Sequence, residues 1–419
     1  MNMLYGGETR ELELARHGLK LLKRSPSSFT PCLDGRYLLL GSDKELNYSE
    51  ISKFSKHDAE AYPRYENLLE KFCGFMDPLL DSSPPEKLQE GSPFNARMKD
   101  NLQKSIFWAH LLRRAASMGQ NDLLEFVNLL LSPASKVLNN WFEADVLKAT
   151  LATDAVIGTT GSINTPGGGY VLLHHMMGET DGERGIWSYV EGGMGSVSLA
   201  ISNAAREAGA AIITEAEVSK LMIEDSGRVS GVLLADGTKV CSSVVLSNAT
   251  PYKTFVDFVP HDVLPDGFLG AIKNSDYSSA TTKINLAVDK LPQFHCCKLN
   301  GSGAGPQHMG TIHIGCERCF DLIEEYAPGF NSSIIGYDML TPPDLEKEFG
   351  LTGGNIFHGA MRLDSLFLLR PVNGWSNYRT PLKGLYLCGS GAHPGGGVMG
   401  APGRNAARVV MQDVSESTG

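Results

Sequence analysis

The chain has 419 residues, of which 42% are apolar and 20% charged, proportions typical of soluble globular proteins. A net charge of −10 with dispersed Lys and Arg argues against a nucleic-acid groove, and no apolar run approaches the ~20 residues that span a bilayer. The length predicts two domains, and the eight cysteines are predicted to be reduced thiols because they lack the spacing of a small disulfide scaffold.

The first 150 residues are predicted to be mainly helical. A helix over residues 8–17 comes first, followed by short strands over 28–32 and 36–40. Helical periodicity then continues from residue 48 to about 140, with one helix starting at Pro63, a favourable first-turn residue. We find no chemistry-bearing cluster in this region, which we interpret as a lid or substrate-side module.

The next stretch alternates helices with glycine-rich turns. Residues 145–157 are predicted to be helical, and a short apolar helix over 170–177 carries His174 and His175, which are expected to be core residues. The sequence Glu-Gly-Gly-Met-Gly at 191–195 then precedes an amphipathic helix over 196–208.

Residues 211–247 contain three β-rich runs. They cover residues 211–224, 228–235 and 238–247, and the Asp236-Gly237 turn between the last two is a strong hairpin signal. Further on we expect a strand over 281–288, a helix over 320–326, and within 338–349 a helix that starts at the prolines of 341–345 and ends at Gly350. A short strand is expected between Gly354 and His358.

The most informative stretch lies near the C-terminus. A strand over 385–388 leads into a glycine-dense loop and then a helix from about Met399, with eight glycines in residues 384–403. A helix N-terminus after such a loop favours an anionic or electron-rich ligand edge, because its N–H groups are unpaired.

Three interpretations of this loop are open. Gly395, Gly397 and Gly400 match a dinucleotide fingerprint, but six residues separate Gly395 from the end of the preceding strand and no further strand follows. A loop that contacts a nucleotide cofactor bound mainly elsewhere fits better. The third interpretation is a loop that serves packing alone.

Other candidate sites are weaker. Zinc binding by Cys296, Cys297, Cys316 and Cys319, with His295 and His313, is disfavoured because a single C-x-x-C is present, so no metal is expected. His358 and His393 lie in glycine-rich loops and are candidates for lining a pocket. The lack of a protein-borne catalytic set fits an enzyme whose cofactor does the chemistry.

Several of these motifs together suggest a family. Residues 191–196, 244–249, 341–346 and above all 384–404 resemble the phytoene desaturase and carotenoid isomerase-like flavoproteins. The resemblance covers nearly the whole chain. It implies an α/β (mixed α+β) architecture: an incomplete glutathione reductase-like FAD/NAD(P)-binding fold, interleaved with a mixed-sheet and helical substrate domain.

The resemblance also implies how the chain divides. Residues 1–150 would form the helical substrate-side region and 151–255 part of the FAD-binding domain with a β-meander. Residues 256–350 would form the substrate-domain sheet, shortened near 317, and 351–419 the closing FAD-binding strand, loop and helix.

Cofactor-binding residues are implied in the same way. Gly389 and Ser390 would face the FAD pyrophosphate and ribityl chain, and the backbone N–H groups of Val398, Met399 and Gly400 the flavin edge. Four further residues would line other parts of FAD. Gly192 and Gly193 would lie near the flavin ring, Val218 near the adenine, and Asn248 near the dinucleotide.

The implied activity is FAD-dependent hydride removal from a small apolar or amine-like substrate, in a mitochondrial setting where a protein partner is also expected. No targeting segment is visible, and neither nucleic acid nor a membrane-spanning segment is expected. The alternative is a non-catalytic interaction module derived from such a flavoprotein.

Two departures from the family accompany the resemblance. The family begins with a strand and G-x-G-x-x-G, and neither precedes Glu8, so we expect a truncated isoform or incomplete gene model that binds FAD weakly or not at all. The second is a missing internal segment with a seam near Glu317-Arg318, which would make the C-x-x-C motif an accident of joining.

Overall fold

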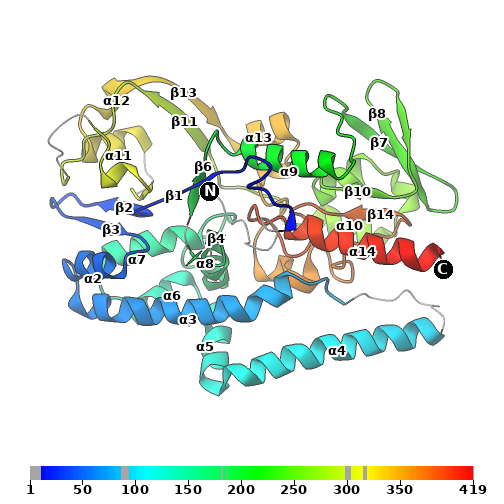
Figure 1. Cartoon of the computed structure of the whole chain (residues 1–419), viewed down its shortest axis with the longest axis horizontal. Helices are drawn as coiled ribbons and strands as arrows, with labels where there is room; N and C mark the ends of the chain where they lie inside the picture. The colour runs from blue at the N-terminus through cyan, green and yellow to red at the C-terminus, as the bar shows by residue number, and fades with distance from the viewer. Residues whose placement is uncertain are drawn as a thin grey trace.

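The computed structural model describes residues 11–85, 94–180, 183–185, 187–297, 303–314 and 319–418. The molecule is elongated, with α3 (Lys56–Leu80) and α4 (Phe94–Met118) along one long edge and small sheets above them (Figure 1). Within the described ranges, no helix combines the length and the apolar content that crossing a membrane would need.

A helical body forms the largest core. Its remaining helices are α2 (Lys44–Ser52), α5 (Gln120–Leu131), α6 (Ala134–Trp141), α7 (Asp145–Ala152) and α8 (Gly168–Met176). Tyr65, Leu69 and Phe72 of α3, on one helical face, are each at most 2% exposed. The Tyr65 ring meets Phe142 edge to face, and the Phe72 ring meets Phe126 in the same way. Aromatic packing thus joins α3 to α5 and to the end of α6.

The predicted start of the long helix at Pro63 is wrong. The Ser55 hydroxyl accepts a hydrogen bond from the Asp58 amide at 3.1 Å and so caps the N-terminus of α3. The helix therefore begins at Lys56, seven residues before Pro63. Pro63 therefore lies inside α3. The burial of the surrounding helix offsets the hydrogen bond that a proline removes.

Several small sheets surround this body. Strands β12 (Thr311–Ile312), β2 (Ser28–Pro31) and β3 (Tyr37–Leu40) form one sheet in that order. Three antiparallel pairs accompany it. They are β1 (Leu21–Lys23) with β6 (Ser188–Val190), β4 (Glu179–Thr180) with β5 (Glu183–Arg184), and β11 (Lys283–Val288) with β13 (Ile334–Leu340).

The second core lies under a parallel pair of strands. A meander of β7 (Val218–Ile223), β8 (Val229–Leu234) and β9 (Lys239–Cys241) leads to β10 (Val245–Ser247), which pairs in parallel with β14 (Leu385–Leu387). The helices α10 (Asp266–Asn274) and α14 (Ala401–Thr418) pack against this pair. The predicted mixed α/β architecture is confirmed.

The remaining helices connect these parts. They are α9 (Gly195–Glu207), α11 (Cys319–Tyr326), α12 (Phe330–Ser333) and α13 (Pro342–Phe349). The predicted helix over 8–17 is wrong from residue 12 onward, because residues 12–18 form turns and Glu13 adopts φ +46°. Residues 8–10 and the proposed seam at Glu317-Arg318 lie outside the described ranges.

Three strand predictions are wrong in part or in full, although β7 lies within the predicted run over 211–224 and β9 and β10 within that over 238–247. Residues 211–217 are irregular, and Ile213 is 77% exposed, because no described strand pairs with this segment. The run over 238–247 divides into β9 and β10 because the chain changes sheets at Ser242 and Ser243. No strand forms between Gly354 and His358, where the chain makes turns with positive φ at both residues.

Candidate functional site

The parallel pair brings two of the predicted cofactor residues together. The amide of Cys388, just after β14, donates to the Ser247 carbonyl of β10 at 2.9 Å. Gly389 then lies so close to Asn248 that a Cβ on Gly389 would meet the Asn248 carbonyl oxygen at 2.5 Å. A residue other than glycine at 389 would therefore push the two strand ends apart.

The inner part of the loop is filled by protein side chains. Gly391, Gly395 and Gly396 are buried, and a Cβ on each would meet Pro251, Met361 and Phe357, respectively. The Phe357 ring fits between Gly396 and Gly158, with a Cβ on either glycine only 2.2 Å from it. These glycines serve packing, as one of the three interpretations of the loop proposed.

We expect Gly396→Ala to destabilise the protein by about 1–3 kcal/mol, because the new methyl group overpacks the Phe357 ring. Urea unfolding measures the loss. The double variant with Phe357→Leu should lose less than the two single variants together, since the clash is removed. Gly270→Ala in α10, where the added methyl meets no atom, is the control and should be neutral or stabilising; equal losses at both glycines would contradict the prediction.

The outer end of the loop has a different character. Val398 and Gly400 are exposed with φ of +58° and +72°, whereas the Met399 side chain is buried. The Arg404 amide donates to the Gly400 carbonyl at 3.1 Å, so α14 begins there. The amides ahead of the first helical turn form a rim that an anionic group can approach.

The predicted residues at Gly192 and Gly193 form a similar exposed turn. Both glycines have positive φ and lie between β6 and the beginning of α9. Residues 11–20 connect this helix to α14, since Leu14 packs against Val197 of α9 and Glu11 pairs with Arg404 of α14 at 3.4 Å (Figure 1). Residues 11–20 therefore contact both α9 and α14, the helices that follow the exposed turns at 192–193 and 398–400.

Val218 is placed in the meander. It is half-buried at the start of β7 and pairs with Leu234 of β8. Ser390 is half-buried beside Gly389, and its carbonyl faces Arg370. The roles implied for both residues stay predictions.

Arg370 organises the loop, and no motif or spacing in the sequence pointed to it. Its guanidinium is 2% exposed and donates to the Ser390 carbonyl at 2.8 and 3.0 Å. It also donates to four more backbone carbonyls, those of Phe357, Gly359, Ala360 and Ser365. Burial lowers the pKa of Arg370 to about 10, which still leaves it charged at neutral pH.

The two histidines proposed to line a pocket are both largely buried. His393 donates from Nε2 to the Leu79 carbonyl at 3.0 Å, which caps the end of α3 and turns its ring toward the helical body. His358 has φ +59° and lies beside Gly391. Burial, with the nearby Arg370 charge, lowers the pKa of each to about 4, so both are neutral at pH 7.

His174 and His175 are core residues, as predicted. His174 is 1% exposed and donates from Nε2 to the Gly396 carbonyl at 2.9 Å. Among the described residues, the Nδ1 atoms of His174, His358 and His393 are buried without a hydrogen-bond partner. Three orphaned ring nitrogens around one loop are unusual in a packed protein, where such groups are normally satisfied.

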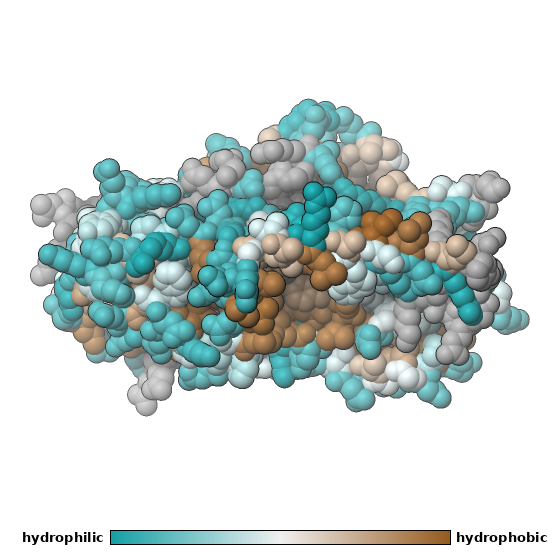
Figure 2. All heavy atoms as spheres, turned by 90° about the horizontal axis from the view of Figure 1, so that it is seen from below, coloured by the Kyte–Doolittle hydropathy of each residue, from teal (hydrophilic) through white to brown (hydrophobic). Residues whose placement is uncertain are grey.

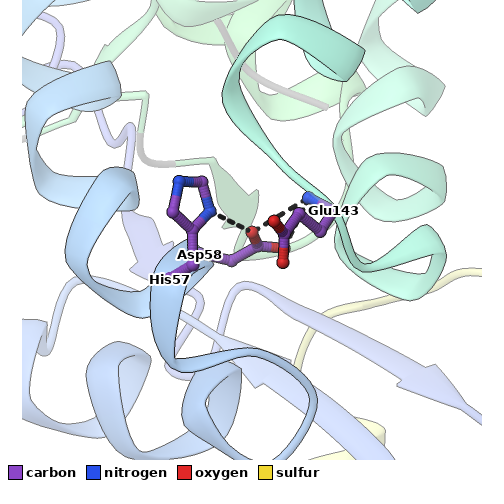
Figure 3. A group of neighbouring side chains, drawn as sticks. All are labelled: His57, Asp58 and Glu143. Atoms are coloured by element: carbon purple, nitrogen blue, oxygen red, sulfur yellow. Dashed lines mark hydrogen bonds and ion pairs between the residues drawn. The ribbon is translucent and has the colours of Figure 1, made fainter.

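One trio of side chains has metal-ligand spacing. In the part of the chain that the structure describes, His57, Asp58 and Glu143 bring ligand atoms within 4.8 Å of one another (Figure 3). Asp58 is fully buried and already accepts from the amides of Glu143 and Ala144 at 2.8–3.1 Å. Although burial opposes it, these amides lower the pKa of Asp58, which therefore serves to hold α3 to the start of α7.

The cysteines considered for zinc do not form such a group where they are described. Cys296 and Cys297 are half-buried, Cys319 is exposed, and all are free thiols. Cys316 lies outside the described ranges.

Two of the cavities that border α3 lie away from the glycine loop. One of about 300 Å³ is lined by α3, α5 and α6, with Tyr65 and Trp141 in its wall. The other, of about 380 Å³, is lined by polar residues such as Glu66 and Arg184.

The chain has clear relatives. A rat protein called pyridine nucleotide-disulfide oxidoreductase domain-containing protein 2 is 44% identical over 485 aligned positions, which cover 96% of this chain and 82% of the relative. Hydroxyneurosporene desaturase from Cereibacter sphaeroides is 27% identical and covers 95% of the chain and 83% of the relative. No family model matches.

The alignment with the rat protein is longer than this chain of 419 residues. The rat protein therefore contains residues inside the aligned region that have no counterpart here. The shortened segment near residue 317 stays a prediction.

Solved structures share the fold. An oxidoreductase from Methanosarcina mazei superposes with a TM-score of 0.52 at 13% identity, covering 97% of this chain and 85% of the other. Cyclohexylamine oxidase from Brevibacterium oxydans gives 0.50 at 13% identity, covering 99% and 87%. The chain therefore belongs to the family of pyridine nucleotide-disulfide oxidoreductase domain-containing protein 2, is related in sequence to a desaturase, and has the fold of an amine oxidase.

Proposed function

We propose that the chain is an FAD-dependent oxidoreductase that removes hydride from a small apolar or amine-like substrate. The observation that carries this proposal is the exposed rim at Val398–Gly400, which follows a parallel strand pair in a member of an oxidoreductase family. Desaturation and amine oxidation, the reactions named for its relatives, both require an acceptor for a hydride. The bound flavin would supply that acceptor.

The residues around the loop fit such a cofactor in part. In the exposed turns at 192–193 and 398–400, the amides of Gly192 and of residues 398–400 can face a flat or anionic ligand edge, whereas the Gly193 amide donates to the Val190 carbonyl. Gly391, Gly395 and Gly396 are already packed by side chains, so we assign them to the loop's shape and not to cofactor contact.

Three groups would act from the chain itself. Arg370 fixes the Ser390 carbonyl and hence the course of the loop. Its charge also favours negative charge developing on a ligand nearby, since a buried cation is weakly screened. His358 and His393, held neutral by burial, would add no positive charge of their own at pH 7.

A charged residue at the rim is expected to weaken cofactor binding without lowering the stability of the free protein. Val398→Asp is expected to leave the free protein as stable or more stable, because Asp tolerates positive φ and a carboxylate is favourable ahead of a helix. The same carboxylate should repel the anionic edge of FAD. Thermal unfolding with and without added FAD reports both effects, and saturating FAD at ~100 times Kd adds about 2.7 kcal/mol to a binding-competent protein.

Val398→Asn is the matched control, with nearly the same size and the same tolerance of positive φ but no charge. We expect FAD to stabilise the wild type and Val398→Asn and not Val398→Asp. Equal stabilisation of all three would show that FAD binds away from the rim. A wild type that FAD does not stabilise at all would favour the non-catalytic interaction module.

We also propose a mitochondrial location and a protein partner there, which rest on the family resemblance alone. Cell fractionation with a mitochondrial matrix marker tests the location.

A further inference from the structure

The antiparallel pair of β1 and β6 carries four large side chains on one face. Leu22 lies opposite Tyr189 in the register of the pair, and these two residues are 43% and 44% exposed. The Arg24 amide donates to the Trp187 carbonyl at 3.4 Å, which extends the pairing by one step. Arg24 is two residues after Leu22, and Trp187 is two residues before Tyr189, so all four side chains point to the same side. We call these four residues the Arg24 face.

The Arg24 guanidinium is held against the two aromatic rings of this face. Its Cζ atom lies 4.1 Å from the centre of the Tyr189 ring and 5.8 Å from the centre of the Trp187 ring. Arg24 is only 7% exposed. The rings stabilise the positive charge, but they accept no hydrogen bond from the N–H groups at the edge of the guanidinium.

Most of the hydrogen-bonding capacity of Arg24 is unused. Nη1 donates to Thr311 Oγ1 at 2.9 Å, whereas Nε is buried without a partner. In the part of the chain that the structure describes, Nη2 makes no hydrogen bond and no carboxylate pairs with Arg24. The hydroxyl of Ser28, the register partner of Thr311, is also buried without a partner. In Arg370, by contrast, all three guanidinium nitrogens donate to carbonyls.

An unpaired buried cation identifies the charge of the missing partner. Burial lowers the pKa of Arg24, because no anion compensates its lost hydration. Nε and Nη2 lie on one edge of the planar guanidinium, where two parallel N–H groups match the two oxygens of a carboxylate. The Arg24 face contains no second basic residue to balance a doubly charged phosphate. This arrangement therefore favours a monocarboxylate.

We propose that the Arg24 face binds a monocarboxylate with a flat apolar body, such as an aromatic acid. The carboxylate accepts from Nε and Nη2 of Arg24, and the body of the ligand lies on the exposed Leu22 and Tyr189 side chains. Apolar side chains also surround a hollow on the face seen from below, the side on which α3 and α4 lie (Figure 2). Apolar surface alone does not select a ligand class, whereas the Arg24 face places a charge beside it.

Calorimetric titration of the full chain with benzoate tests this proposal. Benzamide is the matched probe, with the same ring and no charge, and inorganic phosphate is the second control. We expect benzoate to bind at least about tenfold more tightly than either, because hydrogen bonds between charged groups are about twice as strong as neutral ones. Arg24→Met should weaken benzoate binding by at least about tenfold and leave benzamide binding unchanged.

Arg36→Met is the matched control variant. Arg36 also lies over an aromatic ring, that of Phe54 at 4.4 Å, but it is exposed and pairs with Asp34. This variant should bind benzoate as the wild type does. The urea midpoint of Arg24→Met should be no lower than that of the wild type, because methionine replaces a buried charge that has no anionic partner.

Tyr189→Leu tests the apolar part of the site at an exposed position, where the substitution does not disturb a core. It should weaken benzoate binding, but less than Arg24→Met does, because the carboxylate contact remains.

The proposal fails if benzoate does not bind the wild type, or if benzamide or phosphate binds as tightly. It also fails if Arg36→Met weakens benzoate binding as much as Arg24→Met, or if Tyr189→Leu leaves it unchanged. A lower urea midpoint of Arg24→Met with unchanged benzoate binding would make Arg24 a structural residue. The titration needs neither FAD nor turnover, so its result is independent of the proposed oxidoreductase function.

Discussion

Replacing Arg370 by methionine is expected to lower the free energy of unfolding by about 3–5 kcal/mol, more than any other single substitution considered for this protein. The reason is that Arg370 donates to five backbone carbonyls, three of them in buried residues, and methionine would leave all five without this donor. Urea unfolding followed by far-UV circular dichroism measures the loss.

Two further substitutions make the result specific. Arg370→Lys keeps a charge but has three donors on one nitrogen and cannot reach carbonyls on two segments at once, so an intermediate loss is expected. Arg362→Met removes an arginine that is half-exposed and pairs with Asp276 and Asp364, and should cost less than about 1 kcal/mol. Similar losses for Arg370→Met and Arg362→Met would contradict this account of the loop.

Mild acid is expected to destabilise the protein strongly. Burial lowers the pKa of His174 to about 3 and those of His175 and His393 to about 4, from a usual value near 6.5. A histidine with a lowered folded-state pKa binds its proton more tightly when unfolded. Its stabilising contribution is complete above pH 6.5 and falls as the pH drops toward 4, by on the order of 2 kcal/mol for each histidine at pH 5.

One carboxyl works in the opposite direction. Burial raises the pKa of Asp154 to about 7, so the folded protein binds that proton more tightly and gains on the order of 2 kcal/mol between pH 7 and pH 5. Burial also lowers the pKa values of His313 and His358 to about 4, so five histidines act against this one carboxyl. We therefore expect a net loss on the order of 8 kcal/mol over this range, visible as a lower urea midpoint at pH 5.

The variant His393→Gln tests how much His393 contributes to this pH dependence. The glutamine amide can still donate to the Leu79 carbonyl, but it does not titrate. The variant should lose about 2 kcal/mol less than the wild type between pH 7 and pH 5. His110→Gln on the exposed part of α4 is the control. An unchanged pH dependence in His393→Gln would mean that His393 is not kept neutral by burial.

The sequence by itself determined the features that local chemistry controls. The strand at 385–387, the glycine loop and the helix after Met399 followed from residue type and spacing, as did the Asp236-Gly237 hairpin. The apolar periodicity of α3 and α8 identified Tyr65, Leu69 and His174 as core residues. Each of these depends on interactions within a few residues or on one buried face, which a sequence displays directly.

Tertiary structure alone decided how the glycine loop is used. Phe357 fills the space at Gly396, His393 turns to the end of α3, and Arg370 binds carbonyls on two segments. These contacts join residues between 13 and 314 positions apart, and no local pattern encodes them. The strand predicted over 211–217 failed for the same reason, because a strand needs a hydrogen-bonded neighbour that its own sequence does not specify.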